Sequence, residues 1–144
     1  MAGEKGNTWI NDYFKLLFNG TAVATIADNA ASTPLTNLYV SLHTADPTAA
    51  GNQSSNEAAY TSYARVAVSR SGTGWTVTAQ TVMPTNTITF PACTGGNPVV
   101  AYFGVGTLAS GSGKLFYTGP LTPNISVSIG VTPQITSTTA ITEA

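Results

Sequence analysis

LYVSLHTADPTAAGNQSSNEAAYTSYARVAVSR, residues 38–70, is the stretch that decides the fold. Apolar and polar side chains alternate over 38–43 and again over 64–69, which is the pattern of a half-buried β-strand. About twenty residues, rich in Ala, Ser, Thr and Asn, join these two predicted strands. A connection of that length in a compact domain is usually functional or held against another surface, because a shorter loop would cost less entropy.

The composition is poor in charge. Charged residues make up 8% of the 144 residues and the formal net charge is -1, whereas typical soluble domains contain about 25% charged residues. Such a surface repels its neighbours weakly, which favours association with other subunits. The five Lys and Arg residues are spread from Lys5 to Lys114 and form no basic stripe, so nucleic acid is not expected as a partner.

The length predicts one domain of ordinary size with its own hydrophobic core. Cys93 is the only cysteine, so an intrachain disulfide is excluded. Residues 1–18 lack the apolar core and cleavage site of a signal peptide, and no stretch approaches the roughly 18 apolar residues that span a bilayer. We therefore expect no membrane contact and a chain that remains in the cytoplasm where it is made.

Residues 7–19 are the one good helical candidate. Asn7 or Thr8 can cap the first turn, and Gly20 suits the left-handed position after the last turn. The apolar side chains fall in two adjacent stripes, Ile10, Phe14 and Leu17, and Trp9, Tyr13 and Leu16. Two roles stay open for this helix: it covers one end of the domain's own core, or it docks on another subunit.

Short strand patterns separated by turn signals fill the rest of the chain. The predicted strands are 21–27, 38–42, 64–68, 75–79, 87–90, 99–105, 114–117, 125–129 and 134–142, and the SGTG turn at 71–74 predicts a hairpin between 64–68 and 75–79. This spacing predicts a mainly β fold, an antiparallel β-sandwich of jelly-roll or immunoglobulin-like type over 21–144, after a helical segment at 1–20. No repeat, heptad or collagen-like triplet is present, so no fibre shaft is expected.

The long loop contains the side chains that most resemble a site. His43 lies three residues before Asp46, but residues three apart in an extended segment point to opposite faces, so no catalytic pair is expected. We expect His43 to bond a loop carbonyl, and Asp46 with Pro47 to open a turn. Oxygen atoms for calcium are offered by Asp46, Asn52, Asn56 and Glu57, yet the spacing of a calcium loop is absent, and local bonds to the backbone are favoured. No metal or other cofactor is predicted.

The remaining candidates each have two interpretations. Glu57 can pair with Arg65 or Arg70, either as a specific contact or as a surface pair of small energy. Cys93 is expected to be a small buried residue and not a nucleophile, because no basic residue lies near it in the sequence to activate the thiol. The aromatic residues could form a sugar-stacking platform but are favoured as core residues; they are Trp75, Tyr60, Tyr63, Tyr102, Phe103, Phe116 and Tyr117.

Four sequence words carry a family resemblance. LYVSLHTADP, NEAAYTSYARVAVSR, GWTV and ITFPACTGG occur in this order, and together they resemble small virion proteins of tailed bacteriophages, described as tail-fibre-like or minor structural proteins. The resemblance runs from Leu38 to the C-terminus, and LHTADP and YARVAV are its most specific words. It implies a virion structural protein and supplies no catalytic motif.

Three functions are considered for such a chain: a structural virion subunit, a carbohydrate-binding tip of a tail fibre, and an enzyme, which is not expected. We favour a compact subunit that decorates or cements the capsid, because 144 residues leave no room for an attachment segment and a shaft; a tail-fibre component with host-surface carbohydrate binding is the alternative. The expected partners are major capsid or tail proteins and copies of the chain itself, first in the host cytoplasm and then in the virion. The predicted interface residues are Trp9, Ile10, Tyr13, Phe14, Leu17, Asp46, Asn56, Glu57, Tyr60 and Arg65.

Overall fold

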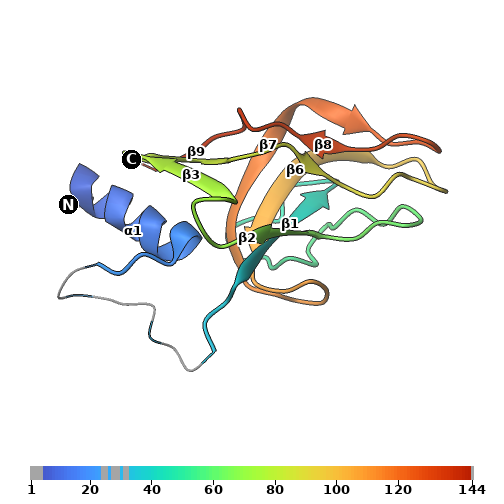
Figure 1. Cartoon of the computed structure of the whole chain (residues 1–144). Helices are drawn as coiled ribbons and strands as arrows, with labels where there is room; N and C mark the ends of the chain where they lie inside the picture. The colour runs from blue at the N-terminus through green and yellow to red at the C-terminus, as the bar shows by residue number, and fades with distance from the viewer. Residues whose placement is uncertain (1–4, 24–25, 27–29, 31–32, 144) are drawn as a thin grey trace. The chain divides into compact units, whose positions relative to one another are not determined.

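The computed structural model describes residues 5–23, 26, 30 and 33–143. Within them, helix α1 (Asn7–Asn19) is followed by strands that are mostly short (Figure 1). These are β1 (Asn37–His43), β2 (Val66–Ser69), β3 (Trp75–Thr78), β4 (Thr81–Pro84), β5 (Ile88–Thr89), β6 (Val99–Gly106), β7 (Leu115–Ser126), β8 (Gln134–Ile135) and β9 (Ile141–Thr142). The mainly β class, the antiparallel pairing and the N-terminal helix are confirmed; the jelly-roll or immunoglobulin-like type stays a prediction.

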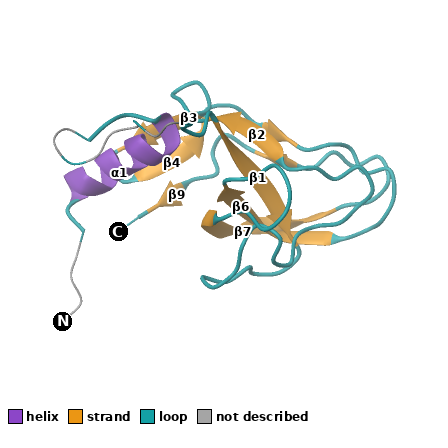
Figure 2. Cartoon of the chain, turned by 90° about the horizontal axis from the view of Figure 1, so that it is seen from below, coloured by secondary structure: helices purple, strands orange, loops and turns teal. Residues whose placement is uncertain are grey.

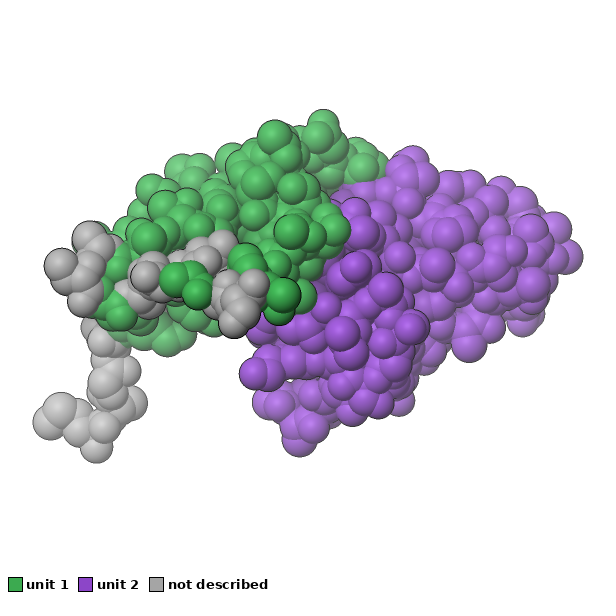
Figure 3. Space-filling model, turned by 60° about the horizontal axis from the view of Figure 1, so that its bottom comes forward, with its two compact units in different colours: residues 1–37, 69–87, 136–144 green, residues 38–68, 88–135 purple. Residues whose placement is uncertain are grey.

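The chain divides into two compact units, each built from separated segments. Unit 1 contains residues 1–37, 69–87 and 136–144, and unit 2 contains 38–68 and 88–135 (Figure 3). Unit 1 thus joins the helix to later strands. The division into a helical segment 1–20 and a β-sandwich domain 21–144 stays a prediction.

Unit 1 consists of α1 and the sheet β3-β4-β9 (Figure 2). The helix buries Ile10, Phe14 and Phe18 completely, and the ring of Phe18 meets that of Trp75 in β3 edge-on, with centroids 4.9 Å apart. Apolar residues at spacings of four fall on one face of a helix, which explains why this stripe is the one that is buried. Leu17, predicted on the buried face, is half-buried, and Phe18 takes its place.

The helix ends as predicted and begins differently. Gly20 adopts the left-handed conformation, with φ of 66°, and its N–H donates to the carbonyl of Lys15. The predicted cap by Asn7 or Thr8 is wrong, because Gly6 holds the N-cap position and no side chain bonds there. At the C-terminal end of the helix, the guanidinium of Arg70 donates to the carbonyls of Leu16 and Leu17, both at 2.6 Å. A cation at a helix C-terminus is stabilising because it faces the negative end of the dipole.

Unit 2 is organised around the sheet β2-β1-β6-β7. In the central pair, Tyr39 faces Gly106 and His43 faces Tyr102, and β6 is flanked on its other side by β7. The predicted central position of 99–105 is confirmed. The short strands β5 and β8 form a separate two-stranded sheet in the same unit.

Four of the predicted strand features differ from the structure or lie partly outside the described residues. The predicted hairpin does not form, because β2 pairs with β1, and β3 turns back on β4 through Ala79 and Gln80. Residues 125–129 do not form a separate strand, because β7 runs without a break from Leu115 to Ser126. Its residues 121–124 form an irregularity in the pairing with β6, opposite Ala101. The tail 134–142 forms two short strands, β8 and β9. Of the predicted strand 21–27, residues 24, 25 and 27 lie outside the described residues, and the other four belong to no named strand.

Candidate functional site: the long loop of unit 2

The long loop, residues 44–63, returns along β1 and covers part of its edge. The N–H of Thr44 donates to the carbonyl of Asn56, and the N–H of Ala58 donates to that of Leu42, both at 2.8 Å. His43 and Glu57 form the corresponding antiparallel bridge. The loop therefore satisfies backbone groups of β1 that no strand reaches.

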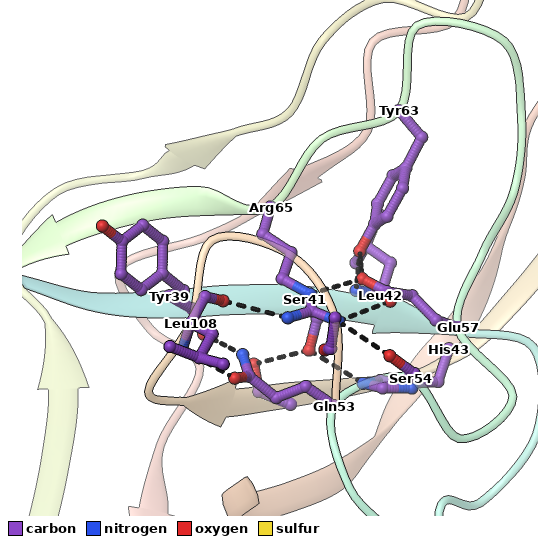
Figure 4. Close-up of polar contacts among 12 residues, drawn as sticks. Tyr39, Ser41, Leu42, His43, Gln53, Ser54, Glu57, Tyr63, Arg65 and Leu108 are labelled. Carbon is purple, nitrogen blue, oxygen red and sulfur yellow. Dashed lines mark hydrogen bonds and ion pairs between the residues drawn. The ribbon is translucent and has the colours of Figure 1, made fainter. Parts of the chain in front are cut away.

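A buried ion pair holds the returning half of the loop (Figure 4). The guanidinium of Arg65 donates to both carboxylate oxygens of Glu57, at 2.6 and 2.7 Å, while only 2% of the Arg65 side chain is exposed. It also donates to the carbonyls of Leu108 and Gly111, at 2.9 and 2.8 Å. The predicted pairing of Glu57 with Arg65 is confirmed as a specific, bidentate contact that also binds the turn 107–114.

Tyr63 connects this pair to β1. Its hydroxyl donates to Glu57 Oε1 at 2.9 Å and accepts the N–H of Leu42 at 3.0 Å. Burial raises the pKa of the Tyr63 hydroxyl far above its ordinary value. The group therefore stays neutral and serves as a fixed hydrogen-bonding bridge.

His43 is fully buried between the loop and the sheet. Its Nδ1 lies 2.8 Å from the carbonyl oxygen of Ser55, and its Nε2 lies 2.8 Å from the hydroxyl of Ser41. A carbonyl can only accept, so Nδ1 carries the proton and Nε2 accepts from the serine. Burial lowers the pKa of this imidazole. The predicted bond to a loop carbonyl is confirmed, and the ring acts as a neutral spacer.

Gln53 anchors the middle of the loop, a role that the sequence pattern does not predict. Its side-chain amide donates to the carbonyl of Tyr39 at 3.2 Å and accepts the N–H of Leu108 at 2.9 Å. The Gln53 side chain fits against β6 only because glycine stands at position 106, where a Cβ would lie 2.3 Å from Gln53 Cδ. A Cβ on Gly104 would lie 2.7 Å from His43 Nε2. These two glycines are two apart in FGVG, which places them on one face of β6, and this spacing is the signal that could have found the buried layer.

The outer part of the loop is held by its own polar side chains. Asp46 Oδ1 accepts the N–H of Thr48 at 2.8 Å, and Asn52 Oδ1 accepts the N–H of Ser54 at 2.9 Å. The amide of Asn56 donates to the carbonyl of Asp46 at 2.9 Å. The predicted local bonding and the Asp46 turn are confirmed. No cluster of three or more His, Cys, Asp or Glu side chains suited to a metal is found in the part of the chain that the structure describes.

The loop also stores backbone strain. Thr48, Asn56 and Ser62 have φ of 64°, 54° and 79°, a region that residues with a Cβ rarely adopt, and Thr48 is β-branched. Such conformations persist only where the surroundings over-determine them. The loop is therefore a pre-shaped surface.

The predicted interface residues range from exposed to buried. Asp46 and Asn56 are exposed on the loop, and on the helix Trp9 is 41% exposed while Tyr13 and Leu17 are half-buried. Glu57 is half-buried in its ion pair. Four of the predicted residues are buried within the chain, so their part in an interface stays a prediction: Ile10, Phe14, Tyr60 and Arg65.

The other candidates lie inside the molecule. Trp75 is buried under Phe18, so it cannot stack on a sugar. The hydroxyl of Tyr60 donates to the carbonyl of Pro91 at 2.9 Å, and Cys93 is buried as predicted. The core assignment is thereby confirmed for Trp75, Tyr60 and Phe103, whereas Tyr63, Tyr102, Phe116 and Tyr117 are half-buried.

Comparison with known proteins assigns a family to this fold. The family model described as podophage GP4 fiber I protein gp80 matches residues 10–142, which include most of α1 and every strand of the described residues. The chain belongs to this family. The resemblance to phage tail-fibre-like structural proteins is confirmed, and the protein is a structural protein of the virion. A comparison with curated proteins found no match. Over the described residues, no helix has the length and apolar character needed to cross a membrane.

Proposed function

We propose that the chain is a subunit of a fibre on a podophage particle, where it acts through contacts with other virion proteins and with copies of itself, and not through catalysis. The observation that carries this proposal is the fibre-family match over residues 10–142. Because the match includes the helix and the strands of both units, the fibre role concerns the whole fold.

The geometry of the long loop supports a role in contacts. His43, Glu57, Tyr63 and Arg65 are the side chains best suited to chemistry, and each is engaged in holding the loop on the sheet. Their engagement leaves a strained, pre-shaped outer surface that presents Asp46 and Asn56. A surface that is already ordered loses little entropy on binding, which favours stable contacts between subunits.

Capsid decoration or cementing is the second candidate. It is favoured by the low charge of the chain, 8% of residues, and by a sequence that contains no shaft-forming repeat. In either role, the proposed partners are major capsid, tail or other fibre proteins, with neither nucleic acid nor membrane involved. The chain is proposed to reside in the host cytoplasm before it assembles into the particle.

Copy number in purified particles tests the two candidates. A fibre subunit is expected in about three to a few tens of copies, set by the symmetry of its attachment points, whereas a decoration protein is expected in hundreds of copies, on the order of the capsid lattice. Quantitative gel densitometry against the major capsid protein measures this number. A count in the hundreds would replace the fibre proposal with decoration.

A further inference from the structure

The few charges of unit 2 have an unusual distribution. The unit contains four charged residues in 38–68 and 88–135, all of which the structure describes. Glu57 and Arg65 neutralise one another in the buried pair. The other two, Asp46 and Lys114, are exposed. The exposed charge of this unit is therefore one carboxylate and one ammonium group.

The strand register places these two charges at opposite ends of the sheet. Asp46 lies three residues beyond the end of β1, whose last residue, His43, faces Tyr102 in the middle of β6, and antiparallel pairing directs this end of β1 toward the start of β6. Lys114 directly precedes β7, and its carbonyl accepts the N–H of Thr107, just beyond the end of β6. Strand β6 spans roughly 20 Å at about 3.3 Å per residue. The structure describes both side chains, and no ion pair joins them within one chain.

Exposed apolar side chains accompany each charge. We call end A the end of the unit 2 sheet that carries Asp46; Val99 begins β6 there and is 49% exposed, and Ile129 follows β7 and is 75% exposed. We call end B the opposite end, where Leu108 is 48% exposed in the same turn as Lys114. Each end therefore combines exposed apolar surface with a single charge, and the two charges are opposite in sign.

We infer that end A of one copy binds end B of a second copy, with Asp46 of one facing Lys114 of the next. The inference rests on the proposed function, because the partner that it names is a second copy of the proposed fibre subunit. Opposite charges on otherwise uncharged ends set the orientation, and the apolar side chains supply most of the buried area. A contact between two different ends is heterologous, so it extends into a ring or a filament.

Charge exchange on the purified full-length chain tests this contact. Sedimentation velocity at low salt over a concentration series measures self-association of the wild type, Asp46→Lys, Lys114→Asp and an equimolar mixture of the two variants. Each variant alone gives both ends the same sign, so its association is expected to weaken about tenfold. In the mixture each end meets an end of opposite charge, and association is expected to return to within about threefold of the wild type.

Control variants separate the contact from damage to the loop. Asp46→Asn keeps an oxygen for the N–H of Thr48 and removes only the charge, so it is expected to weaken association by less than the lysine variant. Asp12→Lys makes the same change of net charge on the helix and is expected to leave association unchanged. Ile129→Ser is expected to weaken it, whereas Leu35→Ser, at an exposed apolar side chain of unit 1, is not.

Two results overturn the inference: a wild-type chain that stays monomeric at all concentrations, or a mixture that associates no better than its components. Neither result changes the copy number in particles, which tests the fibre role separately. Conversely, recovery in the mixture together with a copy number in the hundreds would retain the end-to-end contact and reject the fibre role.

Discussion

The Glu57–Arg65 pair shows how a nearly uncharged chain uses its charges. The Arg65 side chain is almost fully buried and binds a carboxylate and two carbonyls. Glu57→Gln would leave this guanidinium without its counter-charge in a desolvated site, so we expect the free energy of unfolding to fall by about 3 kcal/mol. Urea unfolding followed by circular dichroism measures the change.

The pair of Lys5 and Glu143 provides the control, because the Lys5 side chain is 51% exposed whereas that of Arg65 is 2% exposed. Water screens this pair, so Lys5→Ala is expected to change the free energy of unfolding by less than about 1 kcal/mol. Equal losses for Glu57→Gln and Lys5→Ala would contradict the structural importance given to the buried pair.

Gly104 is a second residue on which the loop depends. A Cβ there would lie 2.7 Å from His43 Nε2 and 2.8 Å from Ser41 Oγ, so Gly104→Ala must displace a buried hydrogen-bonded layer. We expect a loss of about 1–3 kcal/mol, the usual cost of overpacking. Gly72→Ala, where no atom lies within 4 Å of the added Cβ, is expected to be tolerated; thermal unfolding compares the two variants.

His43 predicts a pH dependence of stability. Burial lowers its pKa in the folded chain below the ordinary value of about 6.5, so the unfolded chain takes up a proton first as the pH falls. Stability linked to this residue is therefore complete above about pH 6.5 and is lost as the pH falls from there toward the folded pKa. Since His43 is the only histidine, His43→Asn should flatten the unfolding free energy between pH 7 and 5. An unchanged slope in the variant would assign the effect to other groups.

At this scale the sequence predicted short-range contacts well and long-range contacts poorly. The Glu57–Arg65 pair and the His43 carbonyl bond span 8 and 12 residues and follow from the chemistry of the loop itself. The role of Arg70 was missed, because its carbonyl partners lie 53 and 54 residues away. The partner of Gln53 at Leu108 is 55 residues away. Such contacts depend on topology, which local pattern does not specify.

Two roles are predicted for the helix, covering the core of its own chain and docking on another subunit, and its buried side chains show the first. Phe14 is completely buried against its own unit, whereas Trp9 is 41% exposed. Phe14→Ala should therefore lower the free energy of unfolding by about 3–5 kcal/mol, and Trp9→Ala by less than about 1 kcal/mol. Guanidinium unfolding measures both. Incorporation of the Trp9 variant into particles then reports on docking without a loss of fold, and normal incorporation would leave the helix with its core role alone.

The elements themselves were predicted where side-chain periodicity is strong. Residues 7–19 and the strands at 38–43 and 99–105 carry clear patterns, and the structure has them at those places. The hairpin was assigned to the wrong partners because the SGTG turn is a strong signal, whereas the true turn uses Ala79 with φ of 52°. Alanine carries no turn signal, so the β3–β4 hairpin was not visible in the sequence.

At the scale of the whole molecule, each unit is assembled from segments that are distant in sequence. Unit 1 joins residues 1–37 to 69–87 and 136–144. The N–H of Glu143 donates to the carbonyl of Gln80, and the amide of Gln80 donates to Asn7. Linear division of the sequence at residue 20 could not reveal this, because the pattern of one segment does not identify its spatial neighbours.

Hydrogen exchange tests whether the two units are separate cooperative structures. If they are, Phe14→Ala should increase amide exchange in β4 and β9, which are far from residue 14 in sequence, while leaving β6 of unit 2 protected. Glu57→Gln should do the reverse, since Arg65 ties the long loop to the turn at 107–114 in unit 2. Mass spectrometry of peptides from both variants measures this. Equal increases throughout the chain in either variant would show that the molecule opens as one cooperative structure.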